Sequence, residues 1–170
     1  KVNLNYKPFF SILVASYNRP QLLKKCINSI INNDFNDFEI IISDDCSPKQ
    51  NEIKSVIDSF KNFKIKFFQQ KKNLKEPNNK NFLVKKAKGK FNIQIGDDDL
   101  LFNDSLSTIK KYIKNNPKFD IYTFGYKVID QYDKLIYSRK APKILKLDDS
   151  NEFILKQIFI SDIFPFWIYH

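Results

Sequence analysis

Residues 91–99 read FNIQIGDDD and place three consecutive carboxylates, Asp97, Asp98 and Asp99, after a short apolar run that ends at Gly96. The apolar run is typical of a buried strand. Like charges some 4 Å apart repel by roughly 4 kcal/mol at an effective dielectric constant of about 20, so the acidic run is costly by itself. Carboxylate oxygens suit hard cations such as Mg²⁺ and Mn²⁺, which often bind a substrate phosphate as well. The run therefore predicts a metal–diphosphate site at the carboxyl end of a strand.

The same three carboxylates also fit a solvated turn that leads into a helix. In that interpretation Asn103 or Asp104 caps a helix that begins near Ser105, and Asp99 faces water. The rest of the chain decides between the two interpretations.

Apolar runs and apolar stripes alternate on both sides of this stretch. The predicted strands are residues 9–16, 38–43, 65–68, 91–95 and 121–126. The predicted helices carry their apolar stripes at residues 22–31, 53–60, 82–87 and 106–113. Asn18 is expected to cap the first helix, residues 73–79 to form a loop, and Gly89 to end the third helix as its C′ glycine. The alternation predicts an α/β fold with a mostly parallel central sheet and helices on both faces.

Polar residues follow three of these strands. They are Ser16, Tyr17 and Asn18 after the first strand, Asp44 and Asp45 after the second, and the acidic run after the fourth. Parallel sheets bind ligands beyond the carboxyl ends of their strands, at a switch in strand order. We therefore expect these three segments to converge on one crevice.

The pattern weakens after residue 127. Residues 128–136 fit a hairpin, residues 151–160 fit a helix, and residues 163–169 are dense in aromatic side chains. The sequence has no apolar run long enough to span a membrane, and Cys26 and Cys46 fit reduced thiols of a cytosolic protein.

Composition limits the function classes. With only three glycines in 170 residues, neither the dinucleotide fingerprint nor the P-loop can be written from this sequence. The net charge of +10 arises mainly from scattered lysines, which fit a solvated surface and also fit attraction to anionic substrates or an anionic membrane. Nucleic acid is the weaker candidate, because the aromatic residues lie in positions that core packing explains.

The assembled motifs resemble the family 2 glycosyltransferases of the GT-A fold, from about residue 9 to residue 170. SILVASYN at residues 11–18 resembles that family's opening strand, and EIIISDDCS at residues 39–47 resembles its strand ending in Asp-Asp-x-Ser. Residues 80–91 resemble the helix and glycine before the metal strand, and GDDD at residues 96–99 resembles the Asp-x-Asp (DXD) segment. Gly96 stands where the first Asp of that run is usual, which moves the metal role to Asp98, with Asp97 beside it.

The resemblance implies a Rossmann-like GT-A fold and the transfer of a sugar, with inversion, from a nucleoside-diphosphate sugar to an acceptor hydroxyl. It implies Mn²⁺ or Mg²⁺ as cofactor, held by Asp98 and Asp97, and places Asp99 beside them or as a helix cap. The implied donor-binding residues are Ala15, Tyr17, Asp44, Asp45, Lys80 and Asp97. Residues 1–127 would form the nucleotide-sugar-binding half, and residues 128–170 the start of the acceptor-binding half.

The family's general base, an Asp or Glu, is expected beyond His170, because it follows an aromatic-rich stretch such as residues 164–169. The expected partners are the sugar donor and a glycan or lipid-linked acceptor of bacterial surface-glycan synthesis in the cell envelope, without nucleic acid. The expected location is the cytoplasm, with peripheral contact at the inner, anionic face of the membrane. A module that binds nucleotide sugars without catalysis is the alternative, and a nucleotidyltransferase is disfavoured because no Gly-rich loop follows the first strand.

Overall fold

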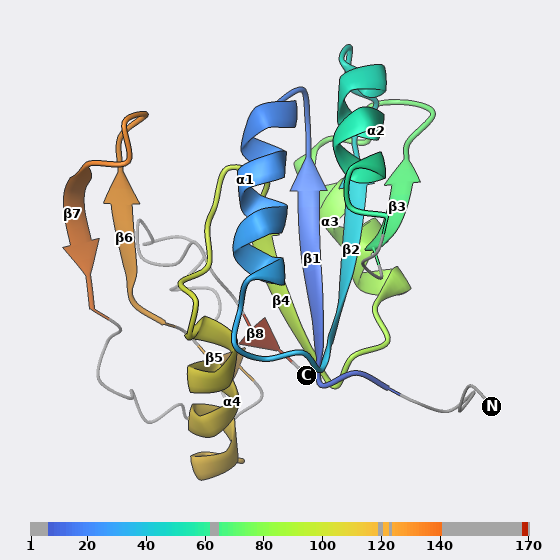
Figure 1. Cartoon of the computed structure of the whole chain (residues 1–170). Coiled ribbons are helices and arrows are strands. Elements are labelled where there is room, and N and C mark those ends of the chain that lie inside the picture. The colour runs from blue at the N-terminus through green and yellow to red at the C-terminus, as the bar shows by residue number, and fades with distance from the viewer. Residues whose placement is uncertain (1–6, 62–64, 119–120, 123, 141–167, 170) are drawn as a thin grey trace.

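Strands and helices alternate along the chain, as predicted (Figure 1). The computed structural model describes residues 7–61, 65–118, 121–122, 124–140 and 168–169. The first eight elements are β1 (Phe10–Ser16), α1 (Pro20–Ile31), β2 (Phe38–Asp44), α2 (Gln50–Asp58), β3 (Ile65–Gln69), α3 (Glu76–Lys86), β4 (Phe91–Gly96) and α4 (Ser105–Asn115). They are followed by β5 (Ile121–Tyr122), β6 (Tyr126–Ile129), β7 (Leu135–Arg139) and β8 (Ile168–Tyr169).

The main sheet has the strand order β3-β2-β1-β4-β8-β5. The first four strands in this order are parallel, and β8 pairs antiparallel with both β4 and β5. From β1 the chain moves outward to β2 and β3, and then crosses back to place β4 on the other side of β1. The switch in strand order that favours ligand binding therefore lies between β1 and β4.

Helices cover both faces of the sheet. The larger apolar core joins α1, α2 and α4 to side chains such as Ile12, Val14 and Ile42. The smaller core lies on the opposite face, where Leu83 of α3 packs against Leu13 and Ile41. Figure 1 shows α1 and α2 in front of the sheet and α3 behind it. The predicted α/β class, with a mostly parallel sheet and helices on both faces, is confirmed.

The start of α3 differs from the prediction. Residues 73–79 were expected to form a loop, but the helix begins at Glu76 and contains Pro77 in its first turn. Proline is tolerated there because the first backbone N–H groups of a helix have no intrahelical partner. The missed turn matters, because it brings Asn79 and Lys80 into a helix beside the sheet.

Gly89 is needed for a different reason from the one predicted. The helix ends at Lys86, and none of the described glycines has a positive φ angle, so the expected C′ conformation at Gly89 is wrong. A Cβ atom at Gly89 would lie 2.4 Å from the backbone nitrogen of Ser11. Gly89 therefore allows the turn before β4 to lie directly against β1.

The last predicted elements have mixed outcomes. The predicted strand 121–126 is two separate strands, β5 and β6, whereas the hairpin expected at residues 128–136 is confirmed as the β6–β7 pair. The helix expected at residues 151–160 lies outside the described residues. None of the described helices has both the length and the apolar character needed to cross a lipid bilayer.

Candidate functional site

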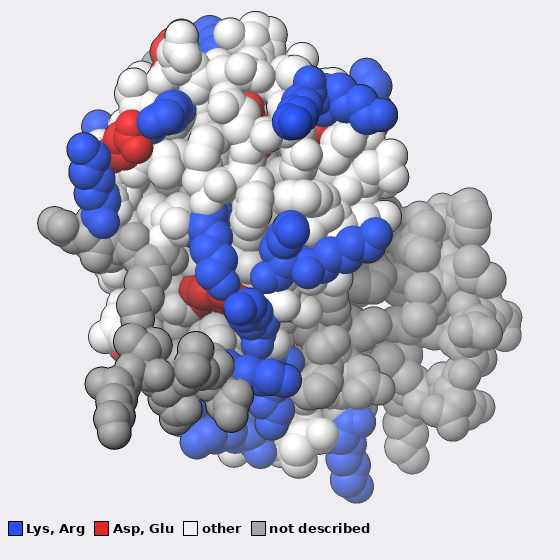
Figure 2. Space-filling model, turned by 90° about the vertical axis from the view of Figure 1, so that its right-hand side faces the viewer, with Lys and Arg blue, Asp and Glu red and all other residues white. Residues whose placement is uncertain are grey.

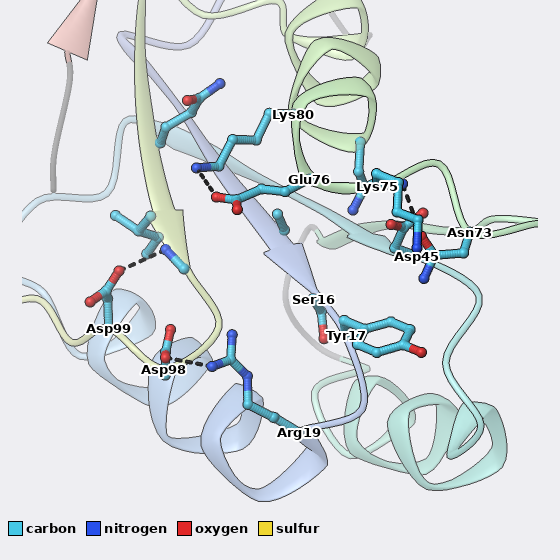
Figure 3. A pocket seen from close by; sticks show the side chains of 15 residues that line it. Ser16, Tyr17, Arg19, Asp45, Asn73, Lys75, Glu76, Lys80, Asp98 and Asp99 are labelled. Carbon is cyan, nitrogen blue, oxygen red and sulfur yellow. Dashed lines mark hydrogen bonds and ion pairs between the residues drawn. The ribbon is translucent and has the colours of Figure 1, made fainter. Parts of the chain in front are cut away.

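A cavity of about 780 Å³ lies at the carboxyl ends of β1, β2 and β4, beside the switch in strand order. Five of the predicted site residues line it: Ala15, Tyr17, Asp45, Lys80 and Asp98. Ser16 and Asp99, which belong to the segments expected to converge, also line it. The unpredicted lining residues include Arg19, Asn73, Lys75, Glu76, Asn79 and Gln94. Figure 3 shows Asp98 and Asp99 on one side of the cavity and Asp45 on the other. The expected convergence of three segments on one crevice is therefore observed.

The turn after β1 forms one wall of the cavity. Tyr17 is 45% exposed, so its ring is available to a ligand. Asn18 has a φ of 59°, and its backbone N–H donates to Oγ of Ser47 at 2.7 Å. The predicted capping role of Asn18 is wrong, since the N-cap residue of α1 is Arg19 and no side chain caps that helix. The left-handed turn at Asn18 instead directs the chain from β1 into Arg19.

Asp44 ends β2 and Asp45 follows it, and the two carboxylates have different environments. Asp44 is fully buried, where it accepts hydrogen bonds from the backbone N–H of Ser47 at 3.1 Å and from the Ser47 hydroxyl. It does not line the cavity, so its position fits the ordering of this turn. Asp45 does line the cavity, and its Oδ1 accepts the backbone N–H of Leu74 at 2.6 Å. This bond anchors the loop before α3 at the cavity mouth.

The position of α3 at the cavity wall depends on the buried side-chain amide of Asn79. Ser43 Oγ donates to Oδ1 of Asn79 at 2.6 Å, and Nδ2 of Asn79 donates to the backbone carbonyl of Ser43 at 3.1 Å. These two bonds hold the first turns of α3 against β2. Lys80, one residue later, lines the cavity and forms an ion pair with Glu76 at 2.5 Å (Figure 3). Lys80 therefore lies at the cavity wall with its charge paired to Glu76, and its contact with a donor phosphate stays a prediction.

Gly96 allows the acidic run to fold back on itself. A Cβ atom at this position would lie 2.6 Å from Oδ1 of Asp98 and 2.9 Å from Oδ2 of Asp99. Without that atom, the backbone N–H of Gly96 donates to Oδ2 of Asp99 at 2.8 Å. Burial raises the pKa of Asp99 above its ordinary value, although the Gly96 hydrogen bond acts to lower it.

Asp97 does not line the cavity, although it follows β4 directly. It is fully buried, and its Oδ2 accepts the backbone N–H of Tyr17 at 3.0 Å. This bond joins the end of β4 to the end of β1. Burial raises the pKa of Asp97, although Ser16, Arg19 and the Tyr17 amide each act to lower it.

Arg19 is the main site residue that the sequence reasoning missed. One guanidinium nitrogen lies 2.5 Å from Oδ1 of Asp97, and the other terminal nitrogen lies 2.5 Å from Oδ2 of Asp98. The local signal was weak: Arg19 is one of only two arginines in the sequence and follows Tyr17 and Asn18 directly. Its partners are 78 and 79 residues away along the chain, so sequence spacing does not reveal the contact.

The carboxylates fit a hard divalent cation in their chemistry. Oδ1 of Asp97 is buried and accepts no hydrogen bond from the part of the chain that the structure describes, although it lies close to Arg19. This oxygen and Oδ2 of Asp98 both approach one cationic group, so they are directed toward a common positive charge. Among the described residues no cluster of three or more His, Cys, Asp or Glu side chains forms a complete metal site. Two carboxylates suit Mg²⁺ or Mn²⁺ when phosphate and water supply the remaining ligands.

Comparison with known proteins gives consistent matches. The family model described as glycosyl transferase family 2 matches residues 11–169. A GalNAc(5)-diNAcBac-PP-undecaprenol beta-1,3-glucosyltransferase of Campylobacter jejuni is 41% identical over 105 residues, which is 60% of this chain and 33% of that protein. An uncharacterised glycosyltransferase of Methanocaldococcus jannaschii is 29% identical over 89% of this chain and 52% of its own length. The chain thus spans about a third and about half of the lengths of these two relatives.

Solved structures share the fold. Residues 1–349 of S. aureus TarS in complex with UDP match with a TM-score of 0.73 and 23% identity, over 96% of this chain and 46% of that one. The same protein in complex with UDP-GlcNAc matches with a TM-score of 0.67 and 25% identity, over 81% of this chain and 37% of that one. A mannosyltransferase from Pyrobaculum calidifontis in complex with GDP-Man and Mn²⁺ matches with a TM-score of 0.63 at 16% identity, over 75% of this chain and 37% of that one. These similarities confirm the expected GT-A fold.

Proposed function

The chain belongs to glycosyl transferase family 2, and on that premise we propose that it transfers a sugar, with inversion, from a nucleoside-diphosphate sugar to an acceptor hydroxyl. The observation that carries the proposal is the cavity itself, which has Asp45 on one side and Asp98 and Asp99 on the other. A nucleoside diphosphate presents hydrogen-bond donors at its base, which suit Asp45. Its negative diphosphate suits the other side when a divalent cation held by Asp98 bridges the two. The Campylobacter jejuni relative, named for a PP-undecaprenol-linked glycan, supports bacterial surface-glycan synthesis as the context.

Each lining residue has a role in this proposal. Asp45 accepts a hydrogen bond from the nucleobase, while the backbone of Ala15 and the ring of Tyr17 line the base pocket. Lys80 interacts with the donor phosphates. Asp44 acts indirectly, because it orders the turn that carries Asp45. We assign residues 1–127 to donor binding and residues 128–170 to the start of the acceptor-binding half.

Asp98 is the proposed ligand of Mn²⁺ or Mg²⁺, with Asp97 beside it as a second ligand or a contact to the ribose. When bound, such a cation stabilises the negative charge that develops on the leaving diphosphate. The backbone of Tyr17 keeps the Asp97 carboxylate in place for this role. Gly96 gives the neighbouring carboxylates the space to fold inward.

Peripheral contact with the anionic, cytoplasmic face of a membrane belongs to the same proposal. Residues 65–96, which run from β3 through α3 to β4, contain nine lysines and one glutamate. Figure 2 shows basic side chains gathered over this side of the molecule, with few acidic ones among them. Each lysine near an anionic bilayer contributes about 1 kcal/mol to binding. This face would hold the cavity close to a lipid-linked acceptor.

The test of donor binding is a thermal-shift titration of UDP and GDP with and without Mn²⁺. A ligand at about 100 times its dissociation constant stabilises the fold by about 2.7 kcal/mol, which corresponds to roughly 5–10 °C in Tm for a chain of this size. Asp98→Ala should remove the Mn²⁺-dependent part of the shift, and Asp45→Ala should weaken nucleotide binding even without metal. Nucleotide shifts that are the same in both variants as in the original protein would contradict the assignment.

Catalysis needs a separate measurement. Release of nucleoside diphosphate from a panel of nucleotide sugars, in the presence of lipid-linked and free glycan acceptors, measures turnover directly. Acceptor-dependent release that is lost in Asp98→Ala supports the transferase. Donor binding without release on any acceptor would instead support the non-catalytic nucleotide-sugar-binding module.

A further inference from the structure

A cation already interacts with the two carboxylates assigned to the metal. The guanidinium of Arg19 spans them, with one nitrogen 2.5 Å from Asp97 and the other 2.5 Å from Asp98. The proposed function assigns these two side chains to Mn²⁺ or Mg²⁺, and the following inference rests on that assignment.

Arg19 and a divalent cation cannot use these oxygens at the same time. Mg²⁺ binds carboxylate oxygens at about 2.0–2.1 Å, which would place it in the space that the guanidinium nitrogens now fill. Two positive groups in one small volume also repel each other strongly. Entry of the metal therefore requires the Arg19 side chain to leave both carboxylates.

The Arg19 side chain can move into the cavity when it leaves the two carboxylates. This side chain is 45% exposed and lines the cavity, so a rotation moves it into the cavity without disturbing the apolar core. The cavity is the proposed place of the donor diphosphate. A guanidinium presents a planar fork of donors that matches phosphate oxygens.

We propose that Arg19 is a competing cation, which neutralises Asp97 and Asp98 in the free protein and moves to the donor diphosphate when the divalent cation takes its place. The nucleotide then stabilises the displaced position of Arg19 and so favours metal binding. By linkage the metal favours nucleotide binding by the same factor. Arg19 thus couples the two ligands, so that neither binds tightly alone.

The test is a titration of Mn²⁺ alone at pH 8, in which electron paramagnetic resonance measures the free ion. The proteins are the original chain, Arg19→Gln, Arg19→Lys and the control Arg139→Gln. Arg139 lies on the exposed strand β7, and its substitution removes the same charge. Circular dichroism checks that each variant is folded, and Arg19→Lys keeps the positive charge if Arg19→Gln fails to fold.

Arg19→Gln should bind Mn²⁺ alone more tightly than the original chain, by at least about fivefold, the lower end of typical coupling between sites. Arg139→Gln should leave the Mn²⁺ affinity unchanged. The Mn²⁺ affinity of Arg19→Lys should lie between those of the original chain and Arg19→Gln, because an ammonium lacks the fork that spans two carboxylates. Adding Asp98→Ala to Arg19→Gln should abolish the gain. The effect on the nucleotide should be the opposite of the effect on the metal. Arg19→Gln should bind UDP more weakly than the original chain.

Equal or weaker Mn²⁺ binding by Arg19→Gln, or an equal gain in Arg139→Gln, would overturn the inference. Unchanged UDP affinity in Arg19→Gln would overturn the movement to the diphosphate. These outcomes are distinct from failure of the proposed function, which is measured as absence of nucleotide binding or of sugar transfer by the original chain.

Discussion

Two glycines affect the structure through the side chain that they lack, and they do so in different ways. At Gly96 the atoms that would meet a Cβ are the flexible carboxylate ends of Asp98 and Asp99, so a side chain there would displace the proposed metal ligand Asp98 and its neighbour Asp99. At Gly89 those atoms include the backbone of β1, which cannot move without disturbing the sheet. We therefore expect a side chain at Gly96 to impair function and a side chain at Gly89 to lower stability.

Gly96→Ala should weaken Mn²⁺-dependent nucleotide binding by roughly tenfold, because it displaces two carboxylates and breaks the charged hydrogen bond to Asp99, which is the kind of contact that contributes about 1.5–3 kcal/mol. Gly89→Ala is the matched comparison, and should lower the free energy of unfolding by roughly 1–3 kcal/mol through overpacking. Urea denaturation and a nucleotide titration with Mn²⁺ measure both effects. Equal losses of stability in the two variants would contradict this division of roles.

At the scale of elements, a buried carboxylate ties three strands together at the end of the sheet away from the cavity. Oε1 of Glu39 on β2 accepts hydrogen bonds from Ser11 Oγ of β1 at 2.6 Å and from the backbone N–H of Lys88 at 2.7 Å. Its Oε2 interacts with Lys66 of β3 at 2.5 Å. Burial raises the pKa of Glu39, but the bonds from Lys66, Ser11 and Lys88 outweigh burial and hold the pKa below its ordinary value. The ionised form is therefore the one that stabilises the fold.

Glu39→Gln should lower the free energy of unfolding by roughly 1–3 kcal/mol at pH 7, since it removes charge-assisted hydrogen bonds from a buried network. A lowered pKa stabilises the protein above the ordinary pKa of Glu and loses this effect as pH falls through the folded value. The difference between Glu39→Gln and the original protein should thus shrink below about pH 4.5. Urea denaturation at a series of pH values measures it, and the exposed Glu52→Gln on α2 is the control. A difference that stays constant from pH 7 to pH 3 would show that the charge of Glu39 contributes nothing.

At the scale of the whole molecule, the basic residues are distributed unevenly. The lysine-rich segment from β3 to β4 borders the cavity through Lys75 and Lys80. Figure 2 shows many basic and few acidic side chains on the side of the molecule that it views. Exposed charges act over about 10 Å at moderate salt, so many lysines on one side act together on a large anionic surface. The proposed orientation toward a membrane would therefore depend on the assembled fold.

The triple variant Lys71→Gln, Lys72→Gln, Lys85→Gln should bind vesicles of anionic phospholipid roughly 100-fold more weakly, at about 1 kcal/mol for each lysine removed. The control is a second triple variant, Lys111→Gln, Lys114→Gln, Lys118→Gln, on and just after α4, with the same change in net charge. Co-sedimentation at two salt concentrations measures both. If the two triple variants lose affinity equally, net charge and not this face is responsible.

The sequence by itself determined the order of the elements and the residue types at the site. Apolar runs and stripes depend on near neighbours, so strands β1 to β4 and helices α1, α2 and α4 could be predicted from them, as could the carboxylates that follow β2 and β4. The start of α3 could not, because Asn79 is held by β2, a partner 36 residues away. Nor did the local pattern reveal that Gly89 packs against β1.

Only the tertiary structure decided which of two adjacent carboxylates faces the cavity. Successive residues in a tight turn point in different directions, so Asp45 lines the cavity while Asp44 is buried, and Asp98 lines it while Asp97 is buried. The same is true of Arg19, whose pairing with the acidic run follows from the position of β4 next to β1. Contacts between segments far apart in the chain depend on strand order, and strand order is not encoded in the periodicity of any one segment.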